Sequence, residues 1–477
     1  MRRLELALVA GLALIGAATP AAIADSGPPP ANPEWPVYGA NLANTRTAPG
    51  GPSAAQAASL HAAWSDTFND GDFTGTPVVS AGVVYVGSNG GVVRAIEAVS
   101  GGSVKPGTVL WSAKVPGPVN GSLAVAPADP ASELSGTDDP ATVFVPVARQ
   151  GSPEVVALNA ATGAQRWATV LDTSTDADVF GSPVPVDMDG RDVVLQGVSA
   201  TSGDPPSPLR GSLSELDAES GAVIWKTYTV PPGDNGGAVW STPAVDTGAG
   251  VVYAGTGNAY TGAAAPTTDA IVKFDLHTGA ILGWFQGTSG DVFSSSNPGF
   301  DFDFGASPNL MNVAGKSLVG EGQKSGTYWA VDTASMKPVW SATLGVGSAA
   351  GGVLGSTAFD AASGQITGPL TLPGYIWSLS APTGQLKWLS PGGVDPVQWS
   401  PVSVSNGVAY SVASTGFVEA WNEANGVRIT AVPLNPIPPS GSYTIGLGSG
   451  VAIADGLVIA DLGSGQGSQG IVAAFSG

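Results

Sequence analysis

The segment ALNAATGAQRW, residues 157–167, contains the pattern that decides the fold of this chain. An apolar strand ends at Asn159, a turn closes at Gly163, and Trp167 lies on the next predicted strand. Asn or Asp before Gly suits a tight turn with a left-handed residue, so the segment predicts a hairpin of antiparallel strands. Similar turns recur at residues 95–101, 215–221, 273–279, 330–336, 378–384 and 420–426. Repetition of one such unit along the chain predicts a β-propeller.

A tryptophan follows six of these seven turns, on the strand that comes after the hairpin. The six are Trp111, Trp167, Trp225, Trp284, Trp340 and Trp388. The seventh turn is followed by Thr430 instead, and Trp240 lies outside the periodic position. A large aromatic side chain at the periodic position can cover the gap between neighbouring sheets. We therefore predict that the six tryptophans are core residues and do not belong to a functional site.

The two ends of the chain bear on the number of blades. Seven complete units occupy roughly residues 77–434, and the tail at 447–477 supplies further strands without a final tryptophan strand. Residues 57–66, AASLHAAWSD, can supply that missing strand. Pairing of N- and C-terminal strands would close the ring and remove its free edges. The chain is therefore predicted to be all-β, an eight-bladed β-propeller of four-stranded antiparallel sheets, with seven blades as the alternative.

Composition limits the classes of partner. The 477 residues include 68 Gly and 39 Pro, with only 11% charged residues, as expected for many short strands joined by turns. The formal charge of −20 argues against nucleic acid or an anionic membrane surface, because either needs a basic patch. No stretch after the N-terminal leader approaches the ~18 apolar residues of a membrane-spanning helix. Neutral or cationic ligands are favoured.

The scarcity of sulfur and imidazole ligands limits the metals. The chain has no Cys, so disulfides, thiolate metal sites and covalently attached haem are excluded. His61 and His277 are the only histidines, which argues against a zinc site, a copper site or a histidine triad. Any bound metal is expected to have oxygen ligands and to be calcium-like.

The first residues resemble an export signal. Arg2 and Arg3 precede an apolar stretch, and Ala22-Ile23-Ala24 matches the small-x-small pattern for cleavage. We predict a signal peptide at 1–24 and a linker at 25–34. Ordinary secretion is favoured over the twin-arginine route because the rest of that motif is missing. The remaining residues, 35–477, are predicted to form one propeller domain in a secreted or periplasmic protein.

Several segments resemble one enzyme family. WPVYGANLANTRTAP at 35–49 and TPVVSAGVVYVGSNGG at 76–91 are similar to segments of the pyrroloquinoline quinone (PQQ)-dependent alcohol dehydrogenases, and most similar to the polyvinyl alcohol dehydrogenase branch. The likeness covers nearly all of the chain after residue 34. The repeat also occurs in non-catalytic propellers that scaffold outer-membrane assembly, so more specific segments decide between the two.

Two of these specific segments carry aromatic and acidic residues. In residues 238–258, Trp240 resembles the tryptophan floor under the PQQ ring, and Asn258 resembles a calcium-ligating asparagine. Stacking on an indole would bury and orient a flat cofactor. In GFDFDFGASPNL at 299–310, Asp301 and Asp303 resemble the segment with the catalytic aspartate, and we choose Asp301 as the base. Their spacing of two places both carboxylates on one face of a strand, where they could share an ion.

Two cations complete the implied site. Lys324 in GEGQKSGTYWAVD, 320–332, resembles the lysine or arginine beside the PQQ quinone oxygens. Arg210 matches a family phrase at 208–221 and would bind a PQQ carboxylate or a neighbouring backbone group. The segment at 197–211 lacks the glutamate that completes the family's calcium site, and its only carboxylate is Asp204. The implied metal ligands are therefore Asn258, Asp301 and Asp303.

The resemblance implies an exported oxidoreductase that transfers hydride from an alcohol, possibly polymeric, to PQQ. Asp301 would accept the proton, Lys324 would stabilise the reduced quinone, and calcium would polarise its carbonyl. With no haem attachment motif, electrons would pass to an external acceptor. The alternative is a non-catalytic propeller that acts as a binding or scaffolding module. A hydrolase or lyase is disfavoured, because no suitable constellation of carboxylates or histidines is present.

Overall fold

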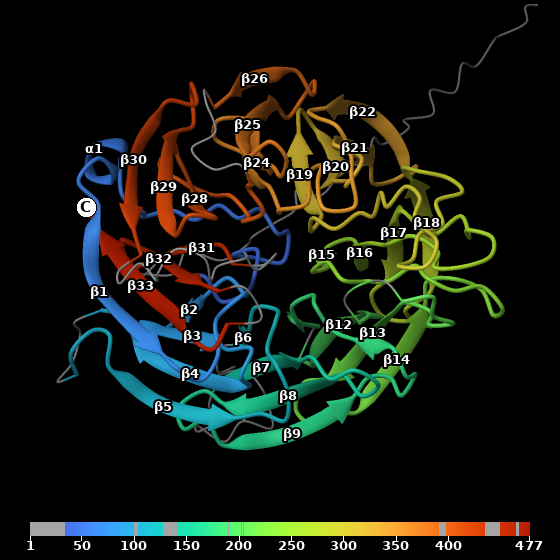
Figure 1. Ribbon diagram of the computed structural model, residues 1–477, viewed down its shortest axis with the longest axis horizontal. Coiled ribbons are helices and arrows are strands. Elements are labelled where there is room, and N and C mark those ends of the chain that lie inside the picture. Colours follow the sequence, from blue (N-terminus) through green and yellow to red (C-terminus); the bar gives the residue numbers. More distant parts are fainter. Residues whose placement is uncertain are drawn as a thin grey trace, which may run out of the picture.

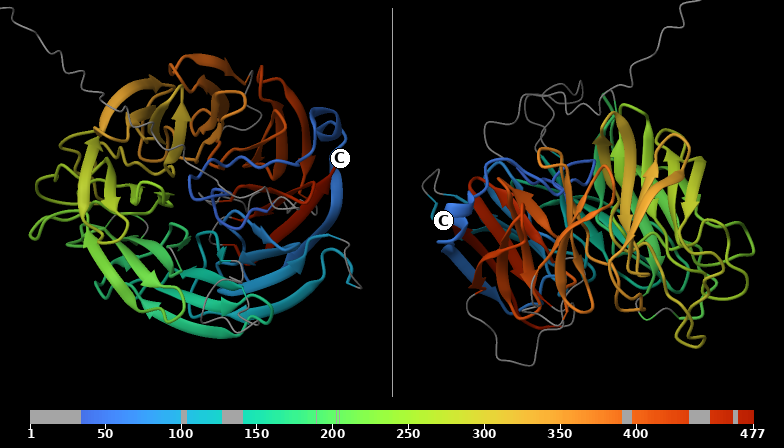
Figure 2. Two further views of the ribbon diagram at one scale, coloured as in Figure 1. Left: turned by 180° about the vertical axis from the view of Figure 1, so that it is seen from behind. Right: turned by 90° about the horizontal axis from the view of Figure 1, so that it is seen from above.

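The computed structural model describes residues 34–99, 104–126, 141–188, 190–201, 203, 205–390, 397–434, 449–463 and 467–477. These residues form eight antiparallel sheets arranged in a ring (Figure 1). Figure 2 shows the ring from behind and from above. The sheets are named blades A to H below, in the order in which their innermost strands follow one another along the chain. Blade H, which also contains the N-terminal strand, is therefore the last. The predictions of a signal peptide at 1–24 and of a linker lie almost wholly outside the described residues.

The first four blades contain strands β2 to β18. Blade A contains β2 (Val78–Ser80), β3 (Val83–Gly87), β4 (Val92–Glu97) and β5 (Val109–Lys114). Blade B contains β6 (Ala124–Ala126), β7 (Thr142–Val147), β8 (Glu154–Asn159) and β9 (Gln165–Val170). Blade C contains β10 (Ala177–Asp178), β11 (Val184–Asp187), β12 (Asp192–Ala200), β13 (Ser212–Asp217) and β14 (Val223–Tyr228), with β10 and β11 both paired to β12. Blade D contains β15 (Ala244–Asp246), β16 (Val251–Gly255), β17 (Ala270–Asp275) and β18 (Ile281–Gln286).

The other four blades complete the ring. Blade E contains β19 (Asn309–Val313), β20 (Lys316–Gly322), β21 (Thr327–Asp332) and β22 (Lys337–Thr343). Blade F contains β23 (Ala358–Asp360), β24 (Gln365–Leu370), β25 (Tyr375–Ser380) and β26 (Leu386–Leu389). Blade G contains β27 (Ser403–Ser405), β28 (Val408–Ala413), β29 (Phe417–Asn422) and β30 (Arg428–Pro433). Blade H contains β31 (Val451–Ala454), β32 (Leu457–Leu462), β33 (Gly470–Ser476) and β1 (His61–Phe68).

The ring closes as predicted, in blade H. Strand β1 pairs antiparallel with β33, from His61 opposite Ser476 to Phe68 opposite Gly470. The eight-bladed propeller is therefore confirmed, and the seven-bladed alternative is wrong. The described part of the chain contains one helix, α1 (Ala54–Ala57), and no helix there is long and apolar enough to span a membrane.

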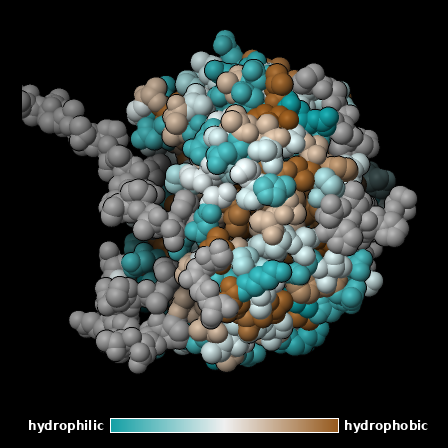
Figure 3. Space-filling view, turned by 90° about the vertical axis from the view of Figure 1, so that its left-hand side faces the viewer, coloured by the Kyte–Doolittle hydropathy of each residue, from teal (hydrophilic) through white to brown (hydrophobic). Residues whose placement is uncertain are grey.

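Valine and alanine fill the space between neighbouring blades. Every residue of β7 and of β32 is buried, whereas the fourth strand of a blade, such as β14, is half exposed at the circumference. On the side of the ring that carries β1 and β30, polar and apolar residues are interspersed (Figure 3). The core therefore lies between the sheets, and the outer strands form the wall.

Hydroxyl side chains at the start of the innermost strands tie consecutive blades together. The Ser122 N–H donates to Ser182 Oγ (3.0 Å), and the Ser182 N–H donates to Thr242 Oγ1 (3.1 Å). The Thr242 N–H donates to Ser307 Oγ (3.0 Å), and the Ser307 N–H donates to Ser356 Oγ (2.8 Å). Each bond satisfies a buried backbone donor across a blade boundary. This belt holds blades B to F in register at the end of the ring where the candidate site lies.

Five of the six tryptophans predicted to be core residues make the same contact with the next blade. The Trp167 indole N–H donates to Ala218 O (2.9 Å), and the ring packs on Gly221, where a Cβ would overlap it. The glycine has a φ of 74°, which suits a residue without a Cβ. The core role is therefore confirmed for five tryptophans. The other four pairs are Trp111 with Gly163, Trp225 with Gly279, Trp340 with Gly384 and Trp388 with Gly426.

Trp284 departs from this rule, and the prediction that it is a core residue was wrong. Its side chain is 44% exposed. Trp284 stands opposite Val272, one residue beyond the strand position of the other tryptophans, so it points to the other face of its strand. The usual position is Gly283, opposite Lys273, and Met336 of the next blade lies against it. Met336 occupies the glycine position of its own turn and is buried with a φ of 53°. Lys273 Nζ donates to Thr333 O (2.9 Å), the carbonyl that corresponds to the indole acceptor in the other pairs. A methionine side chain thus takes the place of the indole between blades D and E.

Met336→Gly is expected to lower the free energy of unfolding by about 2 kcal/mol, because loss of a buried methionine side chain outweighs the relief of left-handed strain. Trp284 should stay exposed, since it points to the other face of its strand. Denaturant unfolding and acrylamide quenching of tryptophan fluorescence measure both effects. Gly279→Met places the same side chain against Trp225 and should also lower stability. Unchanged or raised stability, or weaker quenching, in Met336→Gly would contradict this explanation.

Candidate functional site

The candidate residues come from turns of blades D and E at one end of the ring. Trp240 precedes β15, Asn258 follows β16, and Lys324 follows β20. Asp301 and Asp303 precede β19. In a meandering antiparallel sheet, the start of the first strand and the turn after the second lie at the same end. The blade topology therefore brings these segments, which are far apart in the sequence, to one mouth of the propeller.

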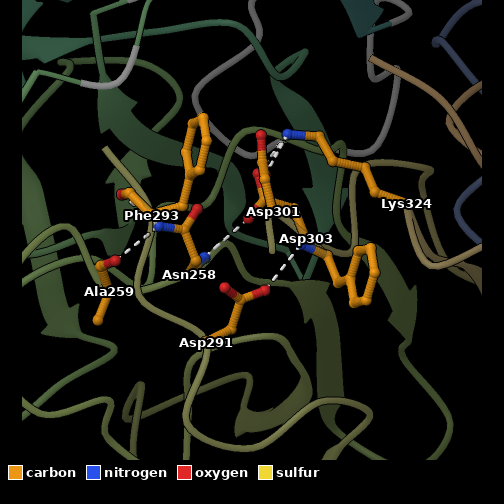
Figure 4. A network of polar contacts seen from close by, with 8 residues as sticks. Asn258, Ala259, Asp291, Phe293, Asp301, Asp303 and Lys324 are labelled. Carbon is orange, nitrogen blue, oxygen red and sulfur yellow. Dashed lines mark hydrogen bonds and ion pairs between the residues drawn. The ribbon is translucent and has the colours of Figure 1, made fainter. Parts of the chain in front are cut away.

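A buried lysine lies between the two aspartates (Figure 4). Lys324 Nζ is 2.7 Å from Asp301 Oδ1 and 2.9 Å from Asp303 Oδ2. The lysine is 6% exposed, and the aspartates are 2% and 5% exposed. Both carboxylates thus contact one cationic group, the ammonium group of Lys324. Their role as metal ligands stays a prediction.

The ammonium group is stabilised in its charged form. Burial by itself would lower the pKa of Lys324, but the carboxylates of Asp303 and Asp301 outweigh burial and raise it. The ammonium nitrogen also lies 5.2 Å from the ring centroid of Trp240, a cation–π contact. Lys324 therefore presents a fixed positive charge beside the indole.

Both aspartates accept hydrogen bonds from the protein. Asp303 Oδ1 accepts the Asn258 N–H (2.8 Å), and its Oδ2 accepts from Lys324. Both oxygens of Asp303 thus have donors from the protein, which suits a structural role. Asp301 Oδ1 accepts from Lys324 as well. The choice of Asp301 as the base stays a prediction from the resemblance of its segment.

The side chain of Asn258 is oriented by two carbonyl groups. Its Nδ2 donates to Ala259 O (2.6 Å) and to Phe293 O (2.8 Å). Both donor hydrogens are used, so the amide orientation is fixed. Within the described part of the chain, Oδ1 has no hydrogen-bond partner. An amide oxygen of this kind is a suitable ligand for a hard cation.

Sequence reasoning missed two buried aspartates in this cluster. Asp291 Oδ2 accepts the Phe302 N–H (2.8 Å), but its buried Oδ1 has no partner among the described residues. Burial, with help from Asp303, raises the pKa of Asp291 to about 6. Asp269 is 0% exposed, and neither of its oxygens has a partner among the described residues. Burial and the carboxylates of Asp303 and Asp291 raise its pKa well above the usual value.

The sequence contains a signal that could have identified Asp269 as a site residue. Asp291 has no such signal, because it lies in a loop without periodicity. Asp269 stands directly before the third strand of its blade, where blades A, E and G have Gly91, Gly326 and Gly416. All three glycines have a positive φ, and Asp269 has a φ of 50°. A carboxylate in place of a glycine that the turn favours is a departure that function can explain.

Trp240 and Arg210 are placed differently with respect to the charged cluster. The Trp240 ring is partly exposed and lies against Gly305, where a Cβ would overlap the indole. Arg210 instead donates through Nε to Val230 O (3.0 Å) and stacks on the ring of Tyr228. No contact within the described residues joins Arg210 to Lys324, so its binding of a PQQ carboxylate stays a prediction. Asp204 lies outside the described residues.

The donor chemistry at this mouth fits the two groups that the resemblance implies. The unpartnered oxygens of Asp291 and Asp269 are hard ligands of the kind that Ca²⁺ prefers, and the side-chain oxygen of Asn258 is another. The partly exposed indole of Trp240 beside an ammonium group suits a flat, anionic ring. Among the described residues, no group of three or more His, Cys, Asp or Glu side chains converges as a metal cluster. A cation would therefore need amide, backbone, cofactor or water oxygens as well.

Comparison with known proteins gives matches over most of the chain. The family model described as outer membrane protein assembly factor BamB matches residues 25–342 and 209–391. A polyvinylalcohol dehydrogenase from Sphingopyxis sp. (strain 113P3) is 28% identical over 448 residues, covering 81% of this chain and 66% of that protein. The quinohemoprotein alcohol dehydrogenase ADH IIB from Pseudomonas putida is 24% identical, covering 78% of this chain and 54% of that protein.

The fold itself is shared with a solved enzyme. The crystal structure of quinohemoprotein alcohol dehydrogenase from Comamonas testosteroni superposes with a TM-score of 0.71 at 18% identity, covering 93% of this chain and 80% of that one. At this identity the likeness concerns the fold. The chain spans just under two thirds of the length of the polyvinylalcohol dehydrogenase that it matches.

Proposed function

Because the chain belongs to the family of PQQ-type repeat propellers described as outer membrane protein assembly factor BamB, and its mouth holds a buried lysine between two aspartates, we propose that it is an exported, PQQ-dependent alcohol dehydrogenase. The lysine–aspartate cluster is the observation that carries the proposal. The relatives named as alcohol dehydrogenases support it.

The residues at the mouth divide the work of alcohol oxidation among them. Trp240 would form the floor under a bound cofactor, and the positive charge of Lys324 would stabilise a reduced, anionic quinone. Asp301 accepts the proton of the alcohol hydroxyl. Bound PQQ would take up the hydride, with a divalent cation polarising its carbonyl. The hydrogen bond from the Asn258 N–H to Asp303 holds the cluster in place. A separate acceptor would take up the electrons, because the sequence contains no Cys to attach a haem.

The alternative, a binding or scaffolding propeller without a cofactor, has support in the description of the family model. Such a module uses its exposed loops and has no need of buried charges. Burying an ammonium group with two carboxylates is costly unless geometry and hydrogen bonds compensate for lost hydration. A cluster of this kind, extended by aspartate oxygens without partners, therefore favours the dehydrogenase.

The direct test is turnover of the purified protein with PQQ, Ca²⁺ and a reducible dye. We expect alcohol-dependent dye reduction that requires added PQQ, with short primary and secondary alcohols and with a polymeric alcohol as substrates. Binding of PQQ without turnover on any of them would contradict the assignment of the reaction. Absence of both PQQ binding and turnover would favour the scaffolding alternative.

We also propose that the substrate is an extended aliphatic alcohol, because exposed apolar side chains accompany the lysine–aspartate cluster in the chain. Phe300 is 69% exposed and stacks on Phe302 (4.9 Å between centroids), and both alternate with the two aspartates along the segment. Val346 is 85% exposed, and Leu372 is also exposed. The loops at 344–357 and 371–374 contain no charged residue. The polyvinylalcohol dehydrogenase relative agrees with such a substrate.

Phe300→Ala is expected to raise KM for a polymeric alcohol by about 10-fold, the effect of roughly 1.4 kcal/mol of lost apolar contact, while KM for 2-propanol changes little. Steady-state kinetics on both substrates measure the difference. Val109→Ala, an exposed apolar residue on blade A, is the control and should affect neither. Equal changes in KM for the polymer and for 2-propanol would contradict this role of Phe300.

A further inference from the structure

A groove of about 470 Å³ lies at the circumference of the ring, between blades A and B. Blade A lines it at and after the end of β5, and blade B lines it from β9 and from the turn before β8. Strands β5 and β9 follow each other along the circumference (Figure 1). A groove of this size can hold a small organic molecule. None of its residues belongs to the lysine–aspartate cluster, so it is separate from the candidate site of blades D and E.

The groove is open because two residues that fill the next blade boundary are replaced here. When the blades are aligned on their core tryptophans, Ala168 of blade B corresponds to Lys226 of blade C. Pro116, which follows blade A, corresponds to Asp172, which follows blade B. Between blades B and C, Lys226 donates to Leu171 O (2.8 Å) and forms an ion pair with Asp172. Alanine and proline do not form such a pair, so the space between blades A and B stays open.

The groove carries an excess of positive charge, although the chain as a whole has a formal charge of −20. Lys114 donates to Gly90 O, a neutral carbonyl, and no carboxylate contacts it in the described part of the chain. Arg149 pairs with Glu154 through Nη1, and its side chain is 41% exposed. The other N–H groups of the guanidinium are therefore open to a ligand. Two cations and one carboxylate leave a net positive charge, which suits an anion.

We propose that this groove binds an organic carboxylate, with the carboxylate group held by Lys114 and Arg149. An ammonium group supplies a point charge, and a guanidinium group supplies donors that match the two oxygens of a carboxylate. Val115, Pro116 and Ala168 offer apolar contact to the hydrocarbon part of the ligand. An inorganic anion would leave these three residues uncovered, whereas an organic acid would contact both the cations and the apolar lining.

Backbone contacts fix the two sides of the groove relative to each other. The Ala148 N–H donates to Pro118 O (2.8 Å) across the blade boundary, and the Ser152 N–H donates to Arg149 O (2.8 Å). Gly117 packs so closely on blade B that a Cβ there would overlap Ala148 O and the Cγ of Arg149. The backbone that carries the cations is thus held in place before a ligand arrives, which reduces the entropic cost of binding.

The test is calorimetric titration of hexanoate into the protein without PQQ, with hexanamide as the uncharged analogue. We expect hexanoate to bind with a Kd of about 1 mM or below, and hexanamide to bind at least about 10-fold more weakly. Lys114→Gln should weaken hexanoate binding by about 10-fold, and it leaves no buried charge unpaired because Lys114 is exposed. Lys337→Gln, which alters an exposed lysine on blade E, is the matched control and should bind hexanoate like the unsubstituted protein.

A second variant tests the groove itself. Pro116→Asp with Ala168→Lys rebuilds the pair that fills the boundary between blades B and C, so it should abolish hexanoate binding in a protein that thermal unfolding shows to be folded. Hexanoate binding that is unchanged in either variant, equal binding of hexanoate and hexanamide, or no hexanoate binding would overturn the proposal. Inorganic phosphate that binds as tightly as hexanoate would overturn the assignment to organic acids. The groove residues take no part in the proposed alcohol oxidation, so turnover with PQQ judges that function separately.

Discussion

Asp301→Asn is expected to lower the turnover number for alcohol oxidation by about 10²- to 10⁴-fold, the usual effect of removing a general base, with PQQ binding largely retained. The amide keeps the size of the side chain but does not accept a proton. Dye-linked turnover gives the rate, and equilibrium dialysis of PQQ gives the binding. Loss of both together would indicate a collapsed site and would not support a role in proton transfer.

Asp303→Asn is the matched comparison, because the two aspartates contact the same lysine. Asp303 also accepts the Asn258 N–H, so its replacement should lower stability more than that of Asp301. The choice of Asp301 as base would be wrong if Asp303→Asn abolished turnover in a folded protein while Asp301→Asn remained active.

Lys324→Met is expected to lower the free energy of unfolding by about 3–5 kcal/mol, because removing one partner leaves buried charge without compensation. Both aspartates that Lys324 contacts are almost fully buried. Urea unfolding with an unchanged m-value measures the effect. The triple substitution of Lys324→Met with Asp301→Asn and Asp303→Asn removes all three charges and should recover much of the loss. A loss below about 1 kcal/mol in the single variant would mean that the cluster is well hydrated.

The repeat made the architecture predictable from sequence, because each turn and its tryptophan are local features. The pairing of residues 57–66 with the tail also followed from counting strands. The exposure of Trp284 had a sequence signal in its spacing, nine residues after Asp275 where Trp167 follows Asn159 by eight. The extra residue places Trp284 on the other face of its strand and Gly283 at the position of the other indoles. Which side chain lies against Gly283, here Met336, is a tertiary contact and is weakly encoded in any one segment.

The site was predictable where the resemblance named residues and less so elsewhere. The convergence of Lys324 with Asp301 and Asp303 agrees with the expected site, whereas Arg210 is engaged by Val230 and Tyr228. Asp269 and Asp291 were missed because an unpartnered oxygen is a property of the packed structure. The replacement of glycine by Asp269 before a third strand was the one available signal, and it becomes visible only when the blades are aligned.

Binding of PQQ at Trp240 is the claim on which the account depends, and equilibrium dialysis of PQQ tests it most directly. Trp284→Ala, which removes an exposed tryptophan on the outer wall, serves as the control. We expect the unsubstituted protein and Trp284→Ala to bind PQQ equally, and Trp240→Ala to bind PQQ about 100-fold more weakly, as for loss of an aromatic anchor. Equal PQQ affinity in all three proteins, or no PQQ binding by the unsubstituted protein, would contradict it.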